Sequence, residues 1–241
     1  MITREDYQRN RFSFLCRFVN VAADIGLEIG AADLPTVMVK PNRCRYADFR
    51  SREEMAALWN LDASAMPKVD FVVRRDQPLS GQIPPDRYGY IVLAHVLEHI
   101  ADPIGYLVDL VGLLAPGGVL VIMLPDKRRT HDEPRPVTSL QHLLNDFHEK
   151  PTYPSVEHIM EYAPCVIDDL KGKDLGTVFH WARANHATGQ ADVHCHVWRD
   201  EDFFAQVDQL IAMGVLANVA AAGRWHNRGE FNEFMLALRA R

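Results

Sequence analysis

Short apolar runs alternate with amphipathic segments along most of the chain. Residues 91–94 and 119–124 are runs of the kind that form buried parallel strands. Between them, apolar residues recur at helical spacing, and Pro116-Gly117-Gly118 supplies a turn that no helix continues through. A strand, a helix and a second parallel strand predict a right-handed βαβ unit.

The remaining segments extend this alternation over residues 1–241, which we expect to form a single α/β domain. Further strands are expected at residues 27–30, 44–48 and 69–73. Helices are expected at residues 4–23, 51–59, 138–149, 155–170 and 202–213. Apolar runs at residues 217–222 and 233–239 flank a polar, glycine-containing loop and predict a terminal antiparallel hairpin. The predicted fold is a doubly wound, seven-stranded sheet that ends in this hairpin.

Composition and charge narrow the class of protein. With 241 residues, 48% of them hydrophobic, the chain can bury one sizeable core. The net charge of −6 excludes a general basic surface for nucleic acid, although a local patch at Lys127, Arg128 and Arg129 remains open. No apolar run approaches the roughly 18 residues that span a membrane, and the N-terminus has no signal-peptide core. Four scattered cysteines suit reduced thiols, so we expect a cytoplasmic protein without nucleic-acid or membrane partners.

One motif identifies a family. The run H-V-L-E-H-I-A-D-P, from His95 to Pro103, is followed 13 residues later by Pro116-Gly117-Gly118. This string resembles the fourth strand, helix and fifth strand of class I S-adenosylmethionine-dependent methyltransferases, in the type 11-like group with a relaxed glycine motif. The terminal hairpin matches the same architecture. The resemblance implies a Rossmann-like methyltransferase sheet and S-adenosylmethionine as the cofactor.

The first strand-to-helix turn is the expected cofactor loop, because doubly wound sheets bind ligands at the carboxyl ends of their strands. The family usually has acid-x-G-x-G-x-G here. This chain keeps Glu28 and Gly30 but carries Ala32 and Leu34 in place of the later glycines. The resemblance assigns Glu28 to organising the turn and the amino group of the cofactor, and it places Gly30 and Ala31 against the cofactor. A strand-end acid that caps the next helix is the alternative for Glu28.

Asp48 ends the second predicted strand, 18 residues after Gly30. An acid there accepts hydrogen bonds from both ribose hydroxyls in nucleotide-binding folds. The alternative is a solvated Asp that caps the following helix. Phe49, next in the chain, is placed to pack on the adenine ring.

Two more sets of residues complete the expected cofactor site. Asp70 and Asp76 flank the third predicted strand, and either is a candidate for the adenine amine. Ala94 and His95 end the fourth strand, where the resemblance places backbone along the cofactor.

Two histidines are candidate bases. Methyl transfer to a hydroxyl requires a base, and histidine suits neutral pH. His99, just past the fourth strand, is the first candidate; capping the next helix together with Glu98 is its alternative. His194 is the second, because His194 and His196 share one face if their segment is extended. They would then be a base and its partner, metal ligands or structural residues. Cys195 would point away and no third ligand is fixed, so no metal site is predicted.

Residues 127–198 form an insertion that the minimal fold does not need. They hold eight of the eleven histidines. By resemblance the insertion caps the substrate cleft; a plain helical elaboration with surface histidines is the alternative. Asp126-Lys127-Arg128, with Arg135 beyond, would either hold an anionic substrate group or form salt bridges to the cap.

The leading hypothesis is a methyltransferase that uses S-adenosylmethionine and acts on a small-molecule or glycan-type acceptor, with oxygen as the expected acceptor atom. The alternative is a module of the same fold that binds without catalysing, because Ala32, Leu34 and Gly89 depart from the family pattern. A nicotinamide-dependent oxidoreductase would need an intact G-x-G-x-x-G, which the sequence lacks.

Overall fold

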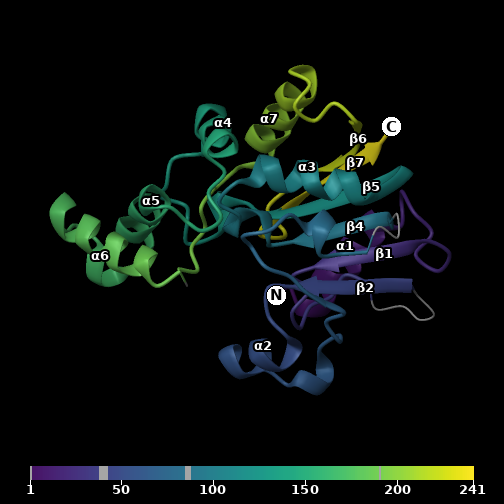
Figure 1. Ribbon diagram of the computed structural model, residues 1–241, viewed down its shortest axis with the longest axis horizontal. Coiled ribbons are helices and arrows are strands. Elements are labelled where there is room, and N and C mark those ends of the chain that lie inside the picture. The colour runs from purple at the N-terminus through teal and green to yellow at the C-terminus, as the bar shows by residue number, and fades with distance from the viewer. Residues whose placement is uncertain (1, 38–42, 85–87, 190) are drawn as a thin grey trace.

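The computed structural model describes the chain except for residues 1, 38–42, 85–87 and 190. Its centre is one seven-stranded sheet with the order β3-β2-β1-β4-β5-β7-β6 (Figure 1). Strands β1 to β5 pair in parallel, whereas β7 is antiparallel to both β5 and β6. The strands are β1 (Ile25–Ile29), β2 (Arg43–Asp48), β3 (Phe71–Val72), β4 (Tyr88–Ala94), β5 (Leu114–Pro125), β6 (Val219–Trp225) and β7 (Glu233–Ala240). The predicted sheet and its terminal hairpin are confirmed.

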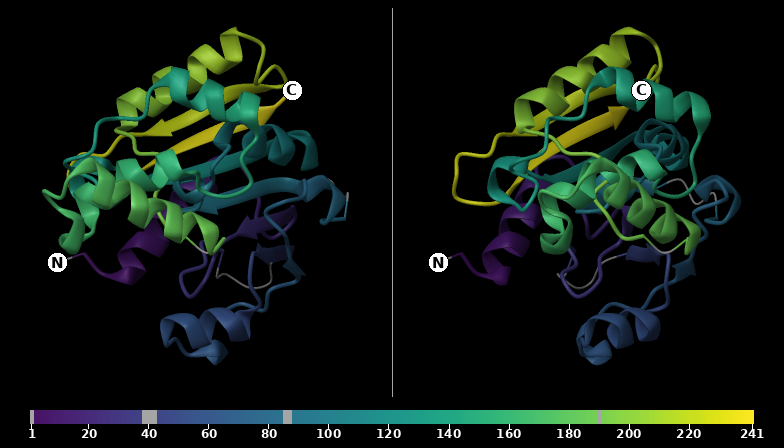
Figure 2. Two further views of the ribbon diagram at one scale, coloured as in Figure 1. Left: turned by 60° about the vertical axis from the view of Figure 1, so that its left-hand side comes forward. Right: turned by 90° about the vertical axis from the view of Figure 1, so that its left-hand side faces the viewer.

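Helices cover both faces of this sheet. They are α1 (Arg4–Leu15), α2 (Arg52–Trp59), α3 (Pro103–Leu113), α4 (Leu140–Glu149), α5 (Val156–Val166), α6 (Leu175–Ala187) and α7 (Asp200–Ala212). Helices α3 and α7 pack on one face, and α1 packs on the other. Figures 1 and 2 show α5 and α6 projecting beyond one end of the sheet.

The period-2 geometry of the strands explains why both faces are apolar. On β4, Ile91 and Leu93 face α3 and α7, while Val92 and Ala94 face the side of α1. Strand β5 alternates in the same way. Because both faces are covered, the strands read as continuous apolar runs, as expected of a parallel sheet.

The first helix is shorter than predicted. It ends at Leu15, although the apolar pattern continues to residue 22. Beyond it, Asn20 Oδ1 accepts a hydrogen bond from the Ala22 amide, and Asp24 Oδ2 accepts one from the Asn20 amide. These side chains offer the backbone an alternative to helical hydrogen bonds, so the helix stops and the chain turns into β1.

Other boundaries differ for local reasons. Pro116-Gly117-Gly118 lies in an irregular start of β5, where the pairing with β4 shifts register, and Gly117 has a φ of +75°. Strand β3 has only two residues against the five expected. Helix α6 was not predicted at all. The other predicted helices are present within a few residues of their expected ends.

The insertion begins and ends at one point of the sheet. After β5, Asp126 pairs with Trp198, and the Lys127 amide donates to the Trp198 carbonyl at 3.0 Å. Helices α4 to α6 lie between these two points. A small apolar core joins part of the insertion to the loop before α3. It is made of Ala101 from that loop and of Ile159, Ala182, Val193 and Cys195 from the insertion.

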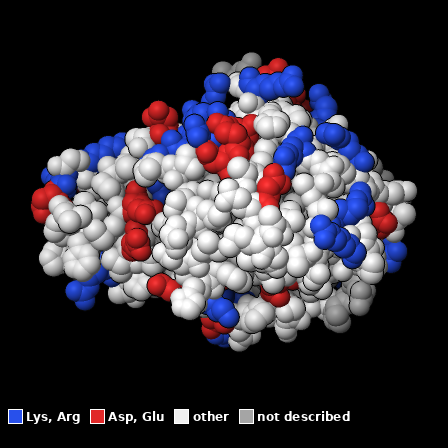
Figure 3. Space-filling view, turned by 90° about the horizontal axis from the view of Figure 1, so that it is seen from above, with Lys and Arg blue, Asp and Glu red and all other residues white. Residues whose placement is uncertain are grey.

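The surface mixes charges of both signs. In the view of Figure 3, Lys and Arg side chains are interspersed with Asp and Glu, and a broad central area carries neither. Among the helices of the described residues, none is long and apolar enough to cross a membrane.

Candidate functional site

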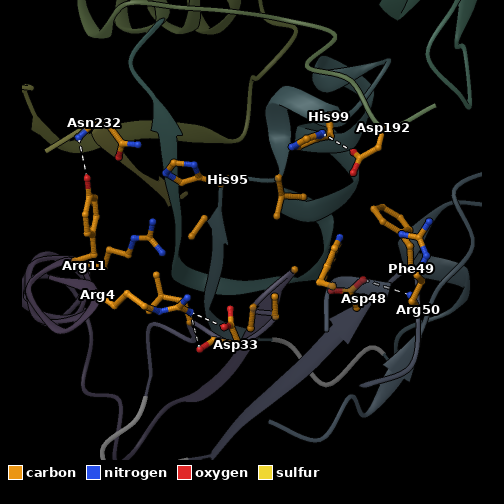
Figure 4. Close-up of a pocket in the computed structure, with 18 of the residues that line it drawn as sticks. Arg4, Arg11, Asp33, Asp48, Phe49, Arg50, His95, His99, Asp192 and Asn232 are labelled. Carbon is orange, nitrogen blue, oxygen red and sulfur yellow. Dashed lines mark hydrogen bonds and ion pairs between the residues drawn. The ribbon is translucent and has the colours of Figure 1, made fainter. Parts of the chain in front are cut away.

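A cavity of about 520 Å³ opens at the carboxyl ends of β1, β2 and β4. Figure 4 shows the side chains around it. Of the eleven residues that the sequence suggested for the cofactor or the base, seven line this cavity; Glu28, Asp70, Asp76 and His194 do not. The seven are Gly30, Ala31, Asp48, Phe49, Ala94, His95 and His99.

The turn after β1 requires glycine at its first position. Gly30 has a φ of +70°, and a Cβ there would lie 2.4 Å from Cγ2 of Val96. Ala32, which replaces the second glycine of the family motif, also takes a positive φ of 45°. A left-handed conformation costs a non-glycine residue about 1–2 kcal/mol. The turn therefore keeps a glycine-like conformation at Ala32 despite the side chain.

Glu28 holds the loop that forms one wall of the cavity. Its side chain is fully buried, and its carboxylate accepts hydrogen bonds from the amides of Thr36 at 2.7 Å and Val37 at 3.4 Å. Burial raises the pKa of Glu28, and these hydrogen bonds oppose that rise. No helix begins among residues 30–37, so Glu28 is not a helix cap. It acts on the cavity through the loop.

Asp48 presents a carboxylate to the cavity at the end of β2. Its Oδ1 accepts the Arg50 amide at 3.3 Å, and burial raises its pKa. The helix-capping alternative is wrong, because Ser51 caps α2. Beside it, the Arg75 guanidinium lies 4.2 Å from the centroid of the Phe49 ring and covers one face of it.

Neither acid proposed for the adenine amine lines the cavity. Asp70 accepts a hydrogen bond from the Tyr46 amide at 2.9 Å, and Asp76 pairs with Arg74 at 2.7 Å. Both side chains are therefore engaged in local structure beside β3.

His95 is fixed by a buried ion pair that the sequence did not suggest. It has a φ of +56°, and its Nε2 lies 3.0 Å from Oε2 of Glu233 at the start of β7. Arg11 of α1 donates two hydrogen bonds to Oε2 of Glu233, from Nε at 3.0 Å and from Nη2 at 2.6 Å. Burial would raise the pKa of Glu233, but the hydrogen bonds from His95 and Arg11 lower it. The ionised carboxylate is an acceptor only, so His95 donates the hydrogen bond from Nε2.

His99 pairs with an acid of the insertion. Its Nδ1 lies 3.0 Å from Oδ1 of Asp192, and both residues line the cavity. Burial lowers the pKa of His99, but the contact with Asp192 and the nearby Glu98 outweigh it, so the pKa lies above its ordinary value. The capping alternative fails, because Asp102 caps α3.

Glu98 and His194 lie next to His99. The His194 ring packs edge-on against His99 with centroids 4.7 Å apart, and its Nδ1 lies 2.5 Å from Oδ2 of Asp132. Both carboxylate oxygens of Glu98 are buried with no hydrogen-bond partner among the described residues. One atom each of Glu98, His99 and His194 lies within 4.8 Å of the others. This group is able to hold a cation or accept hydrogen bonds.

The two histidines of the V-H-C-H-V-W run do not form the predicted pair. His194 faces His99, whereas His196 is fully buried and lies 3.6 Å from Asp146 of α4. The segment bends around Cys195, whose amide donates to the Glu98 carbonyl at 2.7 Å. The extended geometry assumed for this run is therefore wrong.

The Asp126-Lys127-Arg128 motif is structural. Arg128 bonds Asp126 and Asp200 through Nη2, at 2.5 and 2.6 Å. Arg135 is buried and donates to Asp132 at 2.9 Å. These guanidinium groups are engaged within the protein and do not line the cavity.

Comparison with known proteins gives the family. A family described as "Methyltransferase domain" matches residues 7–164, which is more than half of the chain. The chain belongs to this methyltransferase family. The match includes β1 to β5 and most of the residues that line the cavity, and the family expected from the sequence is confirmed. No curated protein matches the chain at a significant level.

Solved methyltransferase structures share the fold at low identity. The carbon methyltransferase CurJ is 14% identical with a TM-score of 0.50, and the alignment covers 99% of this chain and 54% of CurJ. CalH, a trans-methyltransferase solved with S-adenosylhomocysteine, is 12% identical with a TM-score of 0.50, over 99% and 59% of the two chains. NodS, an N-methyltransferase from Bradyrhizobium japonicum solved with the same ligand, is 17% identical with a TM-score of 0.47, over 96% and 86%. The chain thus spans little more than half of CurJ and CalH.

Proposed function

We propose that this chain transfers the methyl group of S-adenosylmethionine to an oxygen of a small-molecule or glycan-type acceptor. The observation that carries the proposal is the cavity at the carboxyl ends of β1, β2 and β4 in a chain of the methyltransferase family. Its volume lies within the range of about 300–1,000 Å³ typical of small-molecule sites. Gly30 leaves backbone open to a ligand, and Asp48 offers a carboxylate for a ribose.

The residues proposed for the cofactor have distinct tasks. Asp48 accepts hydrogen bonds from the ribose hydroxyls, and Phe49 packs beside the adenine on the face that Arg75 leaves open. Gly30, Ala31, Ala94 and His95 form the wall along the cofactor. Glu28 is a positioning residue, because it reaches the cavity only through the loop that it holds.

The binding site for the methyl acceptor is proposed to lie between His99 and the insertion. S-adenosylmethionine supplies an activated methyl carbon and a neutral leaving group. His99, whose Nδ1 lies beside Asp192, would use Nε2 to take the proton of an acceptor hydroxyl as the new carbon–oxygen bond forms. His194 holds the His99 ring from the side. Residues 127–198 supply Asp192 and would determine which acceptor fits.

Removing the carboxylate of Asp48 tests the cofactor site. We expect Asp48→Ala to lose one or two charge-assisted hydrogen bonds to the ribose, about 2–4 kcal/mol. The dissociation constant for S-adenosylhomocysteine should rise roughly 30- to 1000-fold, as measured by calorimetry. Asp76→Ala is the matched control, because Asp76 does not line the cavity, and its affinity should stay at the wild-type value. Equal affinity of Asp48→Ala and wild type would remove Asp48 from the site.

The pH profile tests the base. Because Asp192 helps to raise the pKa of His99, turnover should increase with pH around a midpoint above about 6.5. In Asp192→Asn the positive form of His99 loses its partner, so this midpoint should move to lower pH. The profile of turnover at saturating cofactor measures both. An unchanged midpoint in Asp192→Asn would show that another group controls the increase of turnover with pH.

A screen for the acceptor tests the reaction itself. Transfer of radiolabelled methyl from S-adenosylmethionine would be followed over small-molecule and glycan fractions of a metabolite extract. Alkali-stable label on a hydroxyl-bearing product is expected. Label found only on amines or carbon would contradict the oxygen assignment, and a binding-only module would bind the cofactor without labelling any fraction.

A further inference from the structure

Five histidines and two acids of the insertion gather into two groups, and the first group, made of His131, Asp132 and His194, packs against His99 of the cavity. The second group contains His142 and Asp146 of α4, His158 of α5 and His196. One ligand atom from each of the four lies within 4.8 Å of all the others. From this arrangement we infer that the insertion holds a structural zinc ion on these four side chains.

The three distances from Asp146 to the histidines are close to those of a tetrahedral zinc site. Oδ2 of Asp146 lies 3.3 Å from Nε2 of His142, 3.2 Å from Nε2 of His158 and 3.6 Å from Nε2 of His196. Zinc bonds of about 2.0–2.2 Å in tetrahedral geometry separate neighbouring ligand atoms by about 3.3–3.6 Å. The side chains would therefore need only small shifts to bind the ion.

The sequence places the ligands from three separate segments. His142 and Asp146 are four residues apart on α4 and share one face of the helix. His158 stands in the first turn of α5, and His196 follows the last helix of the insertion. A metal on these residues would join the segments around the small apolar core of the insertion.

The surroundings of His142 suit a metal ligand. Glu161 of α5 lies 3.5 Å from Nδ1 of His142, the place where metal-binding histidines commonly have a carboxylate partner.

Without a metal, the group is poorly satisfied. His196 is fully buried, its Nδ1 has no hydrogen-bond partner among the described residues, and its Nε2 reaches the Ala101 carbonyl only at 3.4 Å. Three imidazoles converge on a single carboxylate oxygen. Three imidazoles and one carboxylate would fill all four positions of a tetrahedral zinc ion and leave none open for a substrate, which is what distinguishes a structural site from a catalytic one.

His158 is the weakest of the four ligands. Its Nδ1 accepts a hydrogen bond from the Ser155 amide at 3.1 Å, which places the ring proton on Nε2. Binding zinc through Nε2 moves that proton to Nδ1 and gives up this hydrogen bond. Substitution of His158 should therefore weaken zinc binding less than substitution of Asp146 or His196.

A zinc ion at this site would stabilise the segment around Cys195, which contacts residues next to the cavity. The amides of Cys195 and His196 both donate to the Glu98 carbonyl, at 2.7 and 3.3 Å. The same segment carries His194, which packs against His99. Zinc on His196 would thus be a positioning device for the cavity wall, without contact to the reacting atoms.

Zinc content of the full-length protein tests the inference. Wild type dialysed against zinc and then against metal-free buffer should retain one zinc per chain, and chelation should lower its melting temperature. Restoring zinc to a hundredfold excess over the dissociation constant should raise the melting temperature by roughly 5–10 °C. Cobalt in place of zinc should give the visible absorption of tetrahedral coordination.

Variants separate this group from the one beside the cavity. Asp146→Asn and His196→Gln should weaken zinc binding more than about 100-fold, beyond the effect typical of outer-shell changes. His148→Gln, on the exposed side of α4, and His194→Gln should retain zinc. Even if a ligand variant fails to fold, the wild-type titration decides the matter. Wild type that binds no zinc, or zinc that is lost in His194→Gln and kept in His196→Gln, would overturn the inference.

Discussion

Replacing His99 with glutamine should lower turnover by about 10²–10⁴-fold, the usual contribution of a general base. Glutamine keeps a polar side chain beside Asp192 but cannot take a proton from the acceptor. The cofactor cavity is otherwise unchanged, so affinity for S-adenosylhomocysteine should stay within a few-fold of wild type. Turnover at saturating cofactor and a binding titration together separate the loss of a base from the loss of the cofactor site.

His131→Gln is a matched control for this prediction. His131 packs beside His194, with ring centroids 4.8 Å apart, but does not line the cavity. Its substitution should leave turnover near the wild-type value. Near-normal turnover of His99→Gln would mean that the acceptor needs no base, as an already neutral amine would, or that the base is another residue.

Replacing Arg11 with methionine should lower the free energy of unfolding by about 3–5 kcal/mol. Arg11 and Glu233 are both buried, and the substitution leaves the Glu233 carboxylate without its bidentate partner. Of its two side-chain partners, His95 would then remain, with Nε2 3.0 Å from the carboxylate. Urea denaturation of the full chain, followed by far-UV circular dichroism, measures the effect.

Helix α1 offers an internal control. Arg9 pairs with Asp6 at 3.6 Å on the surface, where such pairs contribute about 0–1 kcal/mol. Arg9→Met should therefore be nearly neutral. A change below 1 kcal/mol in Arg11→Met would show that the pair is not required. Recovery of stability in a double variant with Glu233→Met would attribute the cost to the unpaired carboxylate.

Short-range patterns predicted the part of the site that follows each strand directly. Gly30 and Asp48 could be placed because a strand-to-loop junction is encoded within a few residues, and the carboxyl ends of neighbouring parallel strands must meet. The same reasoning placed His95 and His99 at the cavity. The family, which was expected from the resemblance of one motif, is confirmed by the family match, and the sheet is confirmed by the structure.

Long-range contacts could not be predicted in the same way. Arg11 and Glu233 are 222 residues apart, and each sits in a segment whose apolar pattern suggests only a helix or a strand. Asp192 gives no signal that connects it to His99. Such pairs arise when separate elements pack, so a single sequence carries no periodicity that marks them.

The contacts of the histidines in the insertion could not be predicted for the same reason. Their abundance was evident, but their division into two groups depends on how α4, α5 and the following segment fold back. An extended run would have put His194 and His196 on one face. The bend around Cys195 instead sends His194 to His99 and His196 to Asp146.

Calorimetric titration of the wild-type chain with S-adenosylhomocysteine tests the central claim most directly. A methyltransferase with the proposed cavity should bind one molecule per chain in a saturable transition. Measuring at two temperatures guards against a binding enthalpy near zero, because burial of apolar surface makes that enthalpy change with temperature. Saturable binding at one site is the predicted result; the absence of heat at both temperatures would contradict the account.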